Sequence, residues 1–203
     1  MTNSLFRQSF LLDTLDMQQA VDEQTTTLPS GVQLKLHQRG VLEVIPASYT
    51  ASSKNMIIST GIHGDETAPM ELVDKIVRDI ETGFQAVKAR CLFIIAHPEA
   101  TNAHTRFLEE NLNRLFDDKD HPMSKELVIA DTLKILVKDF FADTDEETRW
   151  HLDLHCAIRG FETLFVRHQP ENPPSDALQS AGGFCQPQPC RSAAAVQFAI
   201  QYL

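Results

Sequence analysis

The spacing of apolar residues along this chain changes between a strand period and a helix period, and this change most constrains the fold. The short apolar run 56–58 ends near Gly61 and is typical of a buried strand. A helical pattern follows, whose apolar residues share one face: Met70, Val73, Ile76, Val77 and Ile80. Strands that alternate with long helices predict an α/β domain, in which helices cover both faces of a mainly parallel or mixed sheet.

Further elements continue this pattern. Residues 32–36 alternate between apolar and polar side chains, and the run 41–45 follows Gly40, so the two segments predict a β-hairpin. Strands are also predicted at 91–96 and 150–156, with a second long helix from 124 to about 141. Residues 99–123 then form a polar loop, and loops of that length are usually functional or disordered.

Metal-binding side chains stand next to these strand ends. His63 and Glu66 lie between a strand and a helix, and His155 ends a later strand. Ligands bind at the carboxyl ends of parallel strands, so we expect these groups to converge on one rim. Two histidines and a carboxylate form a catalytic zinc site when a fourth position stays open for water. Asp153, on the same face of the strand, is placed to hold the second nitrogen of His155.

Each of these residues also has a plainer interpretation. A single His-x-x-Glu pair is more often a pair of solvated loop residues or a helix cap, and Asp153 and His155 fit an exposed strand face as well. Cys156 lacks an identifiable base, so it is not predicted to be a nucleophile. The other six histidines, His151 among them, receive no role.

Three separated segments carry a family resemblance. Residues 61–69 (GIHGDETAP), 111–116 (NLNRLF) and 149–160 (RWHLDLHCAIRG) resemble the signature segments of the succinylglutamate desuccinylase and aspartoacylase family of zinc carboxypeptidase-like hydrolases. The resemblance covers roughly residues 40–166, and the AIRG at the end of the third segment favours the desuccinylase branch. It implies a zinc carboxypeptidase-like fold.

The resemblance also implies roles for single residues. His63, Glu66 and His155 are then the ligands of one zinc ion per chain. Arg106 polarises the scissile amide carbonyl, because guanidinium stabilises the charge of a developing oxyanion. Substrate carboxylates are implied to bind at Asn113 and Arg114, with Arg159 as a further candidate. The implied reaction is zinc-dependent hydrolysis of N-succinyl-L-glutamate to succinate and L-glutamate, a step of arginine catabolism.

Two alternatives to this function stay open. The first is another hydrolase of the same zinc group, such as an aspartoacylase-like deacylase or a carboxypeptidase, whose substrate would be another N-acyl-amino acid or a peptide. A fragment that binds zinc without catalysis is the second alternative.

The composition of the chain limits the classes of partner that it can bind. The formal net charge of −10 argues against nucleic acid, since phosphate binding needs a clustered basic face. No apolar run approaches the length of a membrane span, and no signal-peptide core is visible, so we expect a cytoplasmic protein with no membrane contact. A small acidic substrate would depend on local arginines. The four cysteines are expected to be free thiols.

The pattern changes near His168. We expect residues 1–168 to form a partial catalytic domain and residues 169–203 an atypical tail without regular structure, because half of the ten prolines lie there. The family resemblance implies a general-base glutamate beyond the matched segments, and we find none in this chain. The domain is therefore expected to be incomplete at its C-terminus, with weak hydrolysis and a tendency to self-associate.

Overall fold

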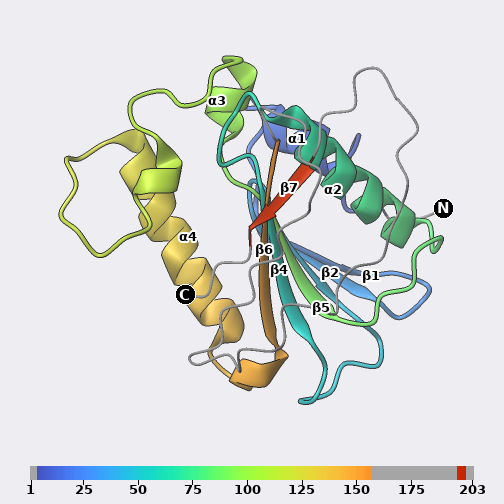
Figure 1. The fold of residues 1–203 in the computed structure, drawn as a ribbon. Coiled ribbons are helices and arrows are strands. Elements are labelled where there is room, and N and C mark those ends of the chain that lie inside the picture. The colour runs from blue at the N-terminus through green and yellow to red at the C-terminus, as the bar shows by residue number, and fades with distance from the viewer. Residues whose placement is uncertain (1–3, 157–195, 200–203) are drawn as a thin grey trace, which may run out of the picture.

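A seven-stranded mixed sheet forms the centre of the protein, as the computed structural model shows for residues 4–156 and 196–199 (Figure 1). The helices are α1 (Phe10–Leu15), α2 (Thr67–Glu81), α3 (Pro98–Asn102) and α4 (Lys125–Phe141), with single 3-10 turns η1 (Leu112–Arg114) and η2 (Glu146–Thr148). The strands are β1 (Gln24–Thr27), β2 (Gln33–Gln38), β3 (Val41–Ile45), β4 (Asn55–Thr60), β5 (Arg90–Ile95), β6 (Arg149–Cys156) and β7 (Val196–Ala199).

The strand order is β1-β2-β3-β5-β4-β6-β7. Strands β5, β4 and β6 are parallel and form the middle of the sheet, whereas β1 to β3 and β7 pair antiparallel on either side. Because the three parallel strands point the same way, their carboxyl ends meet at one rim. This topology confirms the predicted mixed α/β architecture with the hairpin at residues 32–45.

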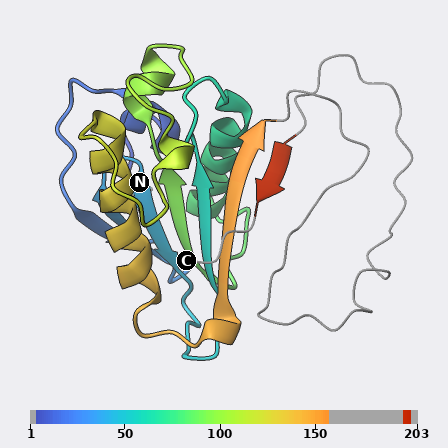
Figure 2. The ribbon, with the colours of Figure 1, turned by 60° about the vertical axis from the view of Figure 1, so that its left-hand side comes forward.

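Helices cover both faces of the sheet, as predicted (Figure 2). Alternate residues of each strand point to opposite faces. On β5, Phe93 and Ile95 therefore join a core with α1 and α2, while Leu92 and Ile94 join a second core with α4. Two apolar layers thus hold the central strands rigidly, which is the requirement for a precise site at their ends.

Helix α2 begins directly after Glu66, which is its N-cap residue. The carboxylate of Glu66 makes no capping hydrogen bond, so it remains free to point toward the rim. Pro69 lies in the first turn, where a proline costs little because no intrahelical N–H bond is lost. The apolar face predicted for this helix packs inward: Met70, Val73, Val77 and Ile80 are buried.

The prediction of one long polar loop over residues 99–123 was wrong in part. Residues 98–102 form α3 and residues 112–114 form η1. Side chains cap both turns: His97 accepts a hydrogen bond from the N–H of Ala100, and Asn111 accepts one from the N–H of Asn113. Such local caps stabilise single turns that are too short to show a helical period.

Several sequence predictions concern residues outside the described part of the chain. They are the boundary at residue 168, residues 169–195 and 200–203 of the tail, Arg159, Cys185 and Cys190. Residues 196–199 of that tail, expected to lack regular structure, form strand β7. Within the described part, Cys91 and Cys156 are free thiols. The helices described here are all too short or too polar to cross a membrane.

Candidate metal centre

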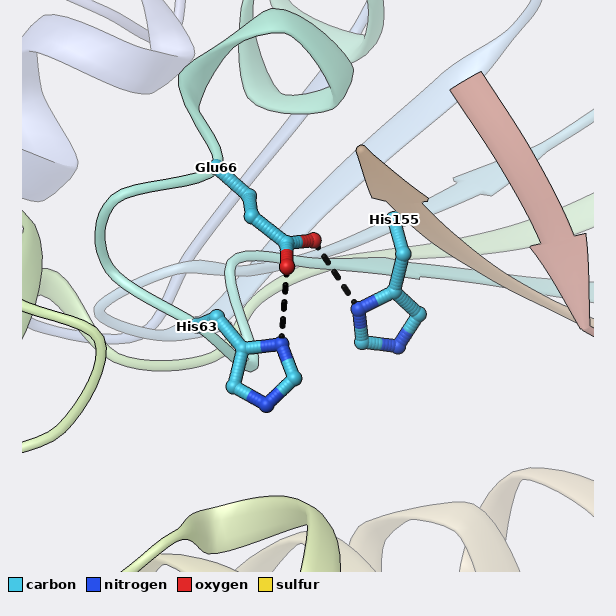
Figure 3. Close-up of side chains that lie close together, drawn as sticks. All are labelled: His63, Glu66 and His155. Carbon is cyan, nitrogen blue, oxygen red and sulfur yellow. Dashed lines mark hydrogen bonds and ion pairs between the residues drawn. The ribbon is translucent and has the colours of Figure 1, made fainter. Parts of the chain in front are cut away.

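Three side chains from three elements meet at the rim of the sheet (Figure 3). His63 comes from the turn after β4, Glu66 from the start of α2, and His155 from the end of β6. One ligand atom from each residue can be chosen so that all three atoms lie within 4.8 Å of one another. His63 and Glu66 are buried and His155 is half-buried. This group could hold a metal ion.

The carboxylate of Glu66 lies between the two imidazoles. Its Oε1 is 3.0 Å from Nδ1 of His63, and its Oε2 is 3.0 Å from Nδ1 of His155. The backbone N–H of Cys156 also donates to Oε2, at 2.8 Å. Burial favours the neutral acid, but these hydrogen bonds outweigh it and hold the pKa of Glu66 well below its usual range. Glu66 is therefore an anion over the whole physiological pH range.

The second nitrogen of each imidazole has its own partner. Nε2 of His155 lies 2.7 Å from Oδ2 of Asp153, and Nε2 of His63 lies 3.1 Å from Oδ1 of Asn111. Both rings are thereby oriented with Nδ1 toward Glu66. In metal sites, such contacts fix the ring and its tautomer so that the free nitrogen can bind the ion. Asn111 was missed by the sequence reasoning, although it opens the NLNRLF segment.

The burial of Asp153 excludes the interpretation that Asp153 and His155 belong to an exposed strand face. Asp153 is 4% exposed, so the polar residues of β6 do not mark a solvated face. A carboxylate is buried at a cost unless it accepts hydrogen bonds, and both oxygens of Asp153 do. The Asp153 side chain is thus held in place behind His155.

Arg106 is the fourth residue of the cluster. Its Nη1 lies 3.1 Å from Oε1 of Glu66, and its side chain is 38% exposed. The backbone carbonyl of Arg106 accepts a hydrogen bond from the N–H of Gly64 at 3.2 Å. The guanidinium is therefore anchored at the candidate centre and still open to a ligand from solvent.

The comparisons with known proteins bear directly on this geometry. The model of the succinylglutamate desuccinylase/aspartoacylase catalytic domain matches residues 52–197. The chain belongs to this family. The match extends past residue 166, where the resemblance seen in the sequence alone stopped.

Individual members of the desuccinylase/aspartoacylase family are very similar to the chain. A protein from Vibrio vulnificus named succinylglutamate desuccinylase is 77% identical over 159 residues, which are 78% of this chain and 46% of that protein. The crystal structure of succinylglutamate desuccinylase from Vibrio cholerae has a TM-score of 0.76 at 67% identity, covering 78% of this chain and 47% of that one. For the desuccinylase from Chromobacterium violaceum, the TM-score is 0.64 at 33% identity, with 75% and 48% covered.

These relatives confirm the zinc carboxypeptidase-like fold predicted for this family member. The chain spans about half the length of the curated relatives it matches.

The remaining substrate residues predicted from the family segments are Asn113, Arg114 and Arg159. Asn113 and Arg114 lie on η1, next to Asn111. Asn113 is half-buried and Arg114 is exposed. Among the described residues, neither side chain forms a hydrogen bond or ion pair with His63, Glu66 or His155, so their roles stay predictions. Arg159 lies outside the described residues.

The charge of His155 gives this family member a testable pH dependence. Burial disfavours the charged imidazole, but hydrogen bonds and attraction from Asp153 and Glu66 outweigh it and raise the pKa of His155 to about 10. The ordinary pKa is 6.5. The resulting stabilisation is fully present below pH 6.5 and is lost as the pH rises through about 10.

We therefore expect the free energy of unfolding of the metal-free chain to fall between these two pH values. Urea denaturation after treatment with a chelator, repeated at several pH values, measures this. The variant His155→Gln should show a flatter profile in the same window. A wild-type profile as flat as that of the variant would contradict the assignment.

Proposed function

We propose that the chain carries the metal-binding part of a zinc-dependent amide hydrolase that converts N-succinyl-L-glutamate to succinate and L-glutamate. The observation that carries this proposal is the meeting of His63, Glu66 and His155, with ligand atoms within 4.8 Å. The choice of substrate is supported by relatives at 67% to 77% identity that are named succinylglutamate desuccinylase.

The donor set fits zinc. Two imidazoles and one carboxylate are the protein ligands of many catalytic zinc sites, which keep a fourth position for water. We propose that Nδ1 of His63, Nδ1 of His155 and the carboxylate of Glu66 hold one zinc ion per chain. Bound zinc supplies a Lewis acid for the amide carbonyl and lowers the pKa of a bound water molecule.

The protein groups around the ligands have their own tasks. Asp153 and Asn111 hold the two imidazoles by their second nitrogens, at 2.7 and 3.1 Å. We propose that Arg106 donates from its guanidinium to the oxygen of the scissile carbonyl and stabilises the negative charge that develops there. Its 38% exposure leaves it accessible to such a substrate.

Substrate carboxylates need cationic or amide donors, because the chain as a whole is acidic, with a formal charge of −10. We propose Asn113 and Arg114 for this task, with Arg159 as a further contact. An arginine matches a carboxylate with two parallel hydrogen bonds. Exposed Arg114 and half-buried Asn113 leave donors available on η1.

A substrate comparison tests the reaction. We expect the chain, extended by the remaining half of the Vibrio cholerae relative, to hydrolyse succinylglutamate at least about tenfold faster than acetylaspartate, since one or two lost contacts to a substrate change kcat/KM by about that factor. Release of free amino acid, measured with both substrates before and after zinc removal, gives the answer. The 203-residue chain alone is measured beside it.

The other possible results of this substrate comparison would each support a different function. Faster hydrolysis of acetylaspartate would indicate an aspartoacylase-like deacylase, and release from peptides alone a carboxypeptidase. Stoichiometric zinc with no turnover of any substrate, even in the extended chain, would indicate a non-catalytic metal-binding protein. Equal rates with and without zinc would contradict the proposed chemistry itself.

A further inference from the structure

A row of polar side chains lies inside the protein behind His155, between the sheet and α4. His151 and Asp153 are two residues apart on β6 and so point to the same face. Ser59 of β4 is paired in register with Asp153, which places it beside this row. The space beside these side chains is lined by the apolar Ile62, Ile94, Phe116, Leu133 and Val137 and by one charged residue, Lys134.

Hydrogen bonds join these side chains into one chain that reaches the candidate metal ligand. The hydroxyl of Ser59 donates to Oδ1 of Asp153 at 2.8 Å, and Nε2 of His151 lies 2.9 Å from the same hydroxyl. The other oxygen of Asp153 contacts Nε2 of His155 at 2.7 Å. Both oxygens of Asp153 are therefore engaged, one by Ser59 and one by His155.

The direction of each bond follows from the chemistry of serine. A hydroxyl has one hydrogen, and that of Ser59 goes to Asp153, so Ser59 must accept from Nε2–H of His151. Burial lowers the pKa of His151, which keeps this ring neutral. Its contact with the Ser59 hydroxyl then places the single ring hydrogen on Nε2. His151 thus directs the hydroxyl of Ser59, and Ser59 directs the carboxylate of Asp153.

Burial of these polar side chains costs free energy, so their presence between the sheet and α4 points to a function. Ser59 and Asp153 are each 4% exposed. Nδ1 of His151 is buried and has no hydrogen-bond partner among the described residues. A cavity of about 30 Å³, bordered by Ser59, His151 and Lys134, lies next to the row. Apolar side chains would fill this space between sheet and helix at lower cost.

We propose that Ser59 and His151 are positioning residues of the metal centre, which act through Asp153 to hold His155 in its metal-binding orientation. This inference rests on the proposed metal-dependent function. Partners that contact a ligand directly change metal affinity by about 10- to 100-fold, and Ser59 acts one contact further away. Its removal should therefore have a smaller effect of the same sign.

Zinc affinity of the full chain, measured by competition with a chromophoric chelator, tests the proposal. We expect Ser59→Ala to weaken zinc binding about fivefold and Asp153→Ala about 10- to 100-fold. In the Asp153→Ala background, Ser59→Ala should change the affinity less than about twofold, because its contact is already gone. His151→Phe, one contact further from His155 than Ser59, should weaken zinc binding by less than Ser59→Ala but in the same direction.

Thr60→Val is the matched control. Thr60 is the next residue of β4, is fully buried, and donates its hydroxyl hydrogen to the carbonyl of Ile94 at 3.0 Å. The variant loses a buried hydroxyl bond but leaves the row intact, so zinc affinity should stay within about twofold. An equal loss of affinity in Thr60→Val and Ser59→Ala would attribute the effect to destabilisation and overturn the proposal.

A second readout works without metal. The Nε2 protons of His151 and His155 should give separate downfield proton resonances in the chelator-treated chain. Ser59→Ala should remove the first and broaden the second, whereas Thr60→Val should leave both unchanged. Unchanged resonances in Ser59→Ala would overturn the inference. A wild-type chain that keeps these resonances but binds no zinc would instead contradict the proposed function alone.

Discussion

We expect His63→Ala to lower the affinity of the chain for zinc by about 1,000-fold or more, because His63 is proposed as a direct ligand. Removing an outer partner of a ligand already costs about 10- to 100-fold, and loss of the ligand itself must cost more. The structure adds a second reason, because Asn111 holds Nε2 of His63 at 3.1 Å and so turns the proposed zinc-binding Nδ1 toward Glu66. Zinc content after dialysis and competition with a chelator give the measurement.

The matched control is His121→Ala. His121 contacts Asp117 in the segment between η1 and α4, where it touches none of the three candidate ligands. Zinc binding should be unchanged in this variant. If His63→Ala keeps zinc within about tenfold of wild type, His63 is no ligand and the three-residue centre is wrong.

Gly64→Ala should destabilise the chain by at least about 3 kcal/mol, the upper end of the usual cost of overpacking. A Cβ at this position would lie 2.3 Å from the carbonyl carbon of Ala100, 2.4 Å from the nitrogen of Thr101 and 2.6 Å from the oxygen of Thr105. All three are backbone atoms, so no side-chain rotation relieves the clash. The segment leading to Arg106 must therefore move away from His63 or the fold must open.

Urea denaturation of the zinc-loaded chain measures this loss, with Gly83→Ala as the control. Gly83 follows α2 at φ 75°, and a Cβ there meets no atom within 4 Å. Only the left-handed backbone conformation then opposes alanine, at about 1 kcal/mol. Equal losses in the two variants would show that the contact between Gly64 and residues 100–105 is not tight.

Most of the fold could be predicted from the sequence because its longer elements have clear periods. Helix α2 and strands β4 to β6 fall where the apolar spacing placed them. Strand β1 was missed because its sequence, QTTT, has no apolar residue and lies at the edge of the sheet. Helix α1 has six residues, which is too short to show a helical period.

The candidate ligands could be predicted for a related reason. His63 and His155 stand at strand ends, and parallel strands bring such ends together without further information. The contacts of Asn111 and Ser59 could not be predicted, because they depend on tertiary packing and on the register between β4 and β6. A shift of that register by one residue would take Asp153 away from Ser59 and turn it to the other face.

The position of β6 in the sheet also has a consequence for the order of folding. Asn55 and Met56 of β4 pair with Arg149 and Trp150 of β6, so the two strands meet only after a long segment of chain has been ordered. Pairing across such sequence separations is slow, because the entropy of closing the loop is lost before the contacts form. His155 joins His63 and Glu66 in this late step. Metal uptake at the proposed centre would therefore report the completion of the native topology, and an ion that binds only then would slow unfolding more than it speeds folding.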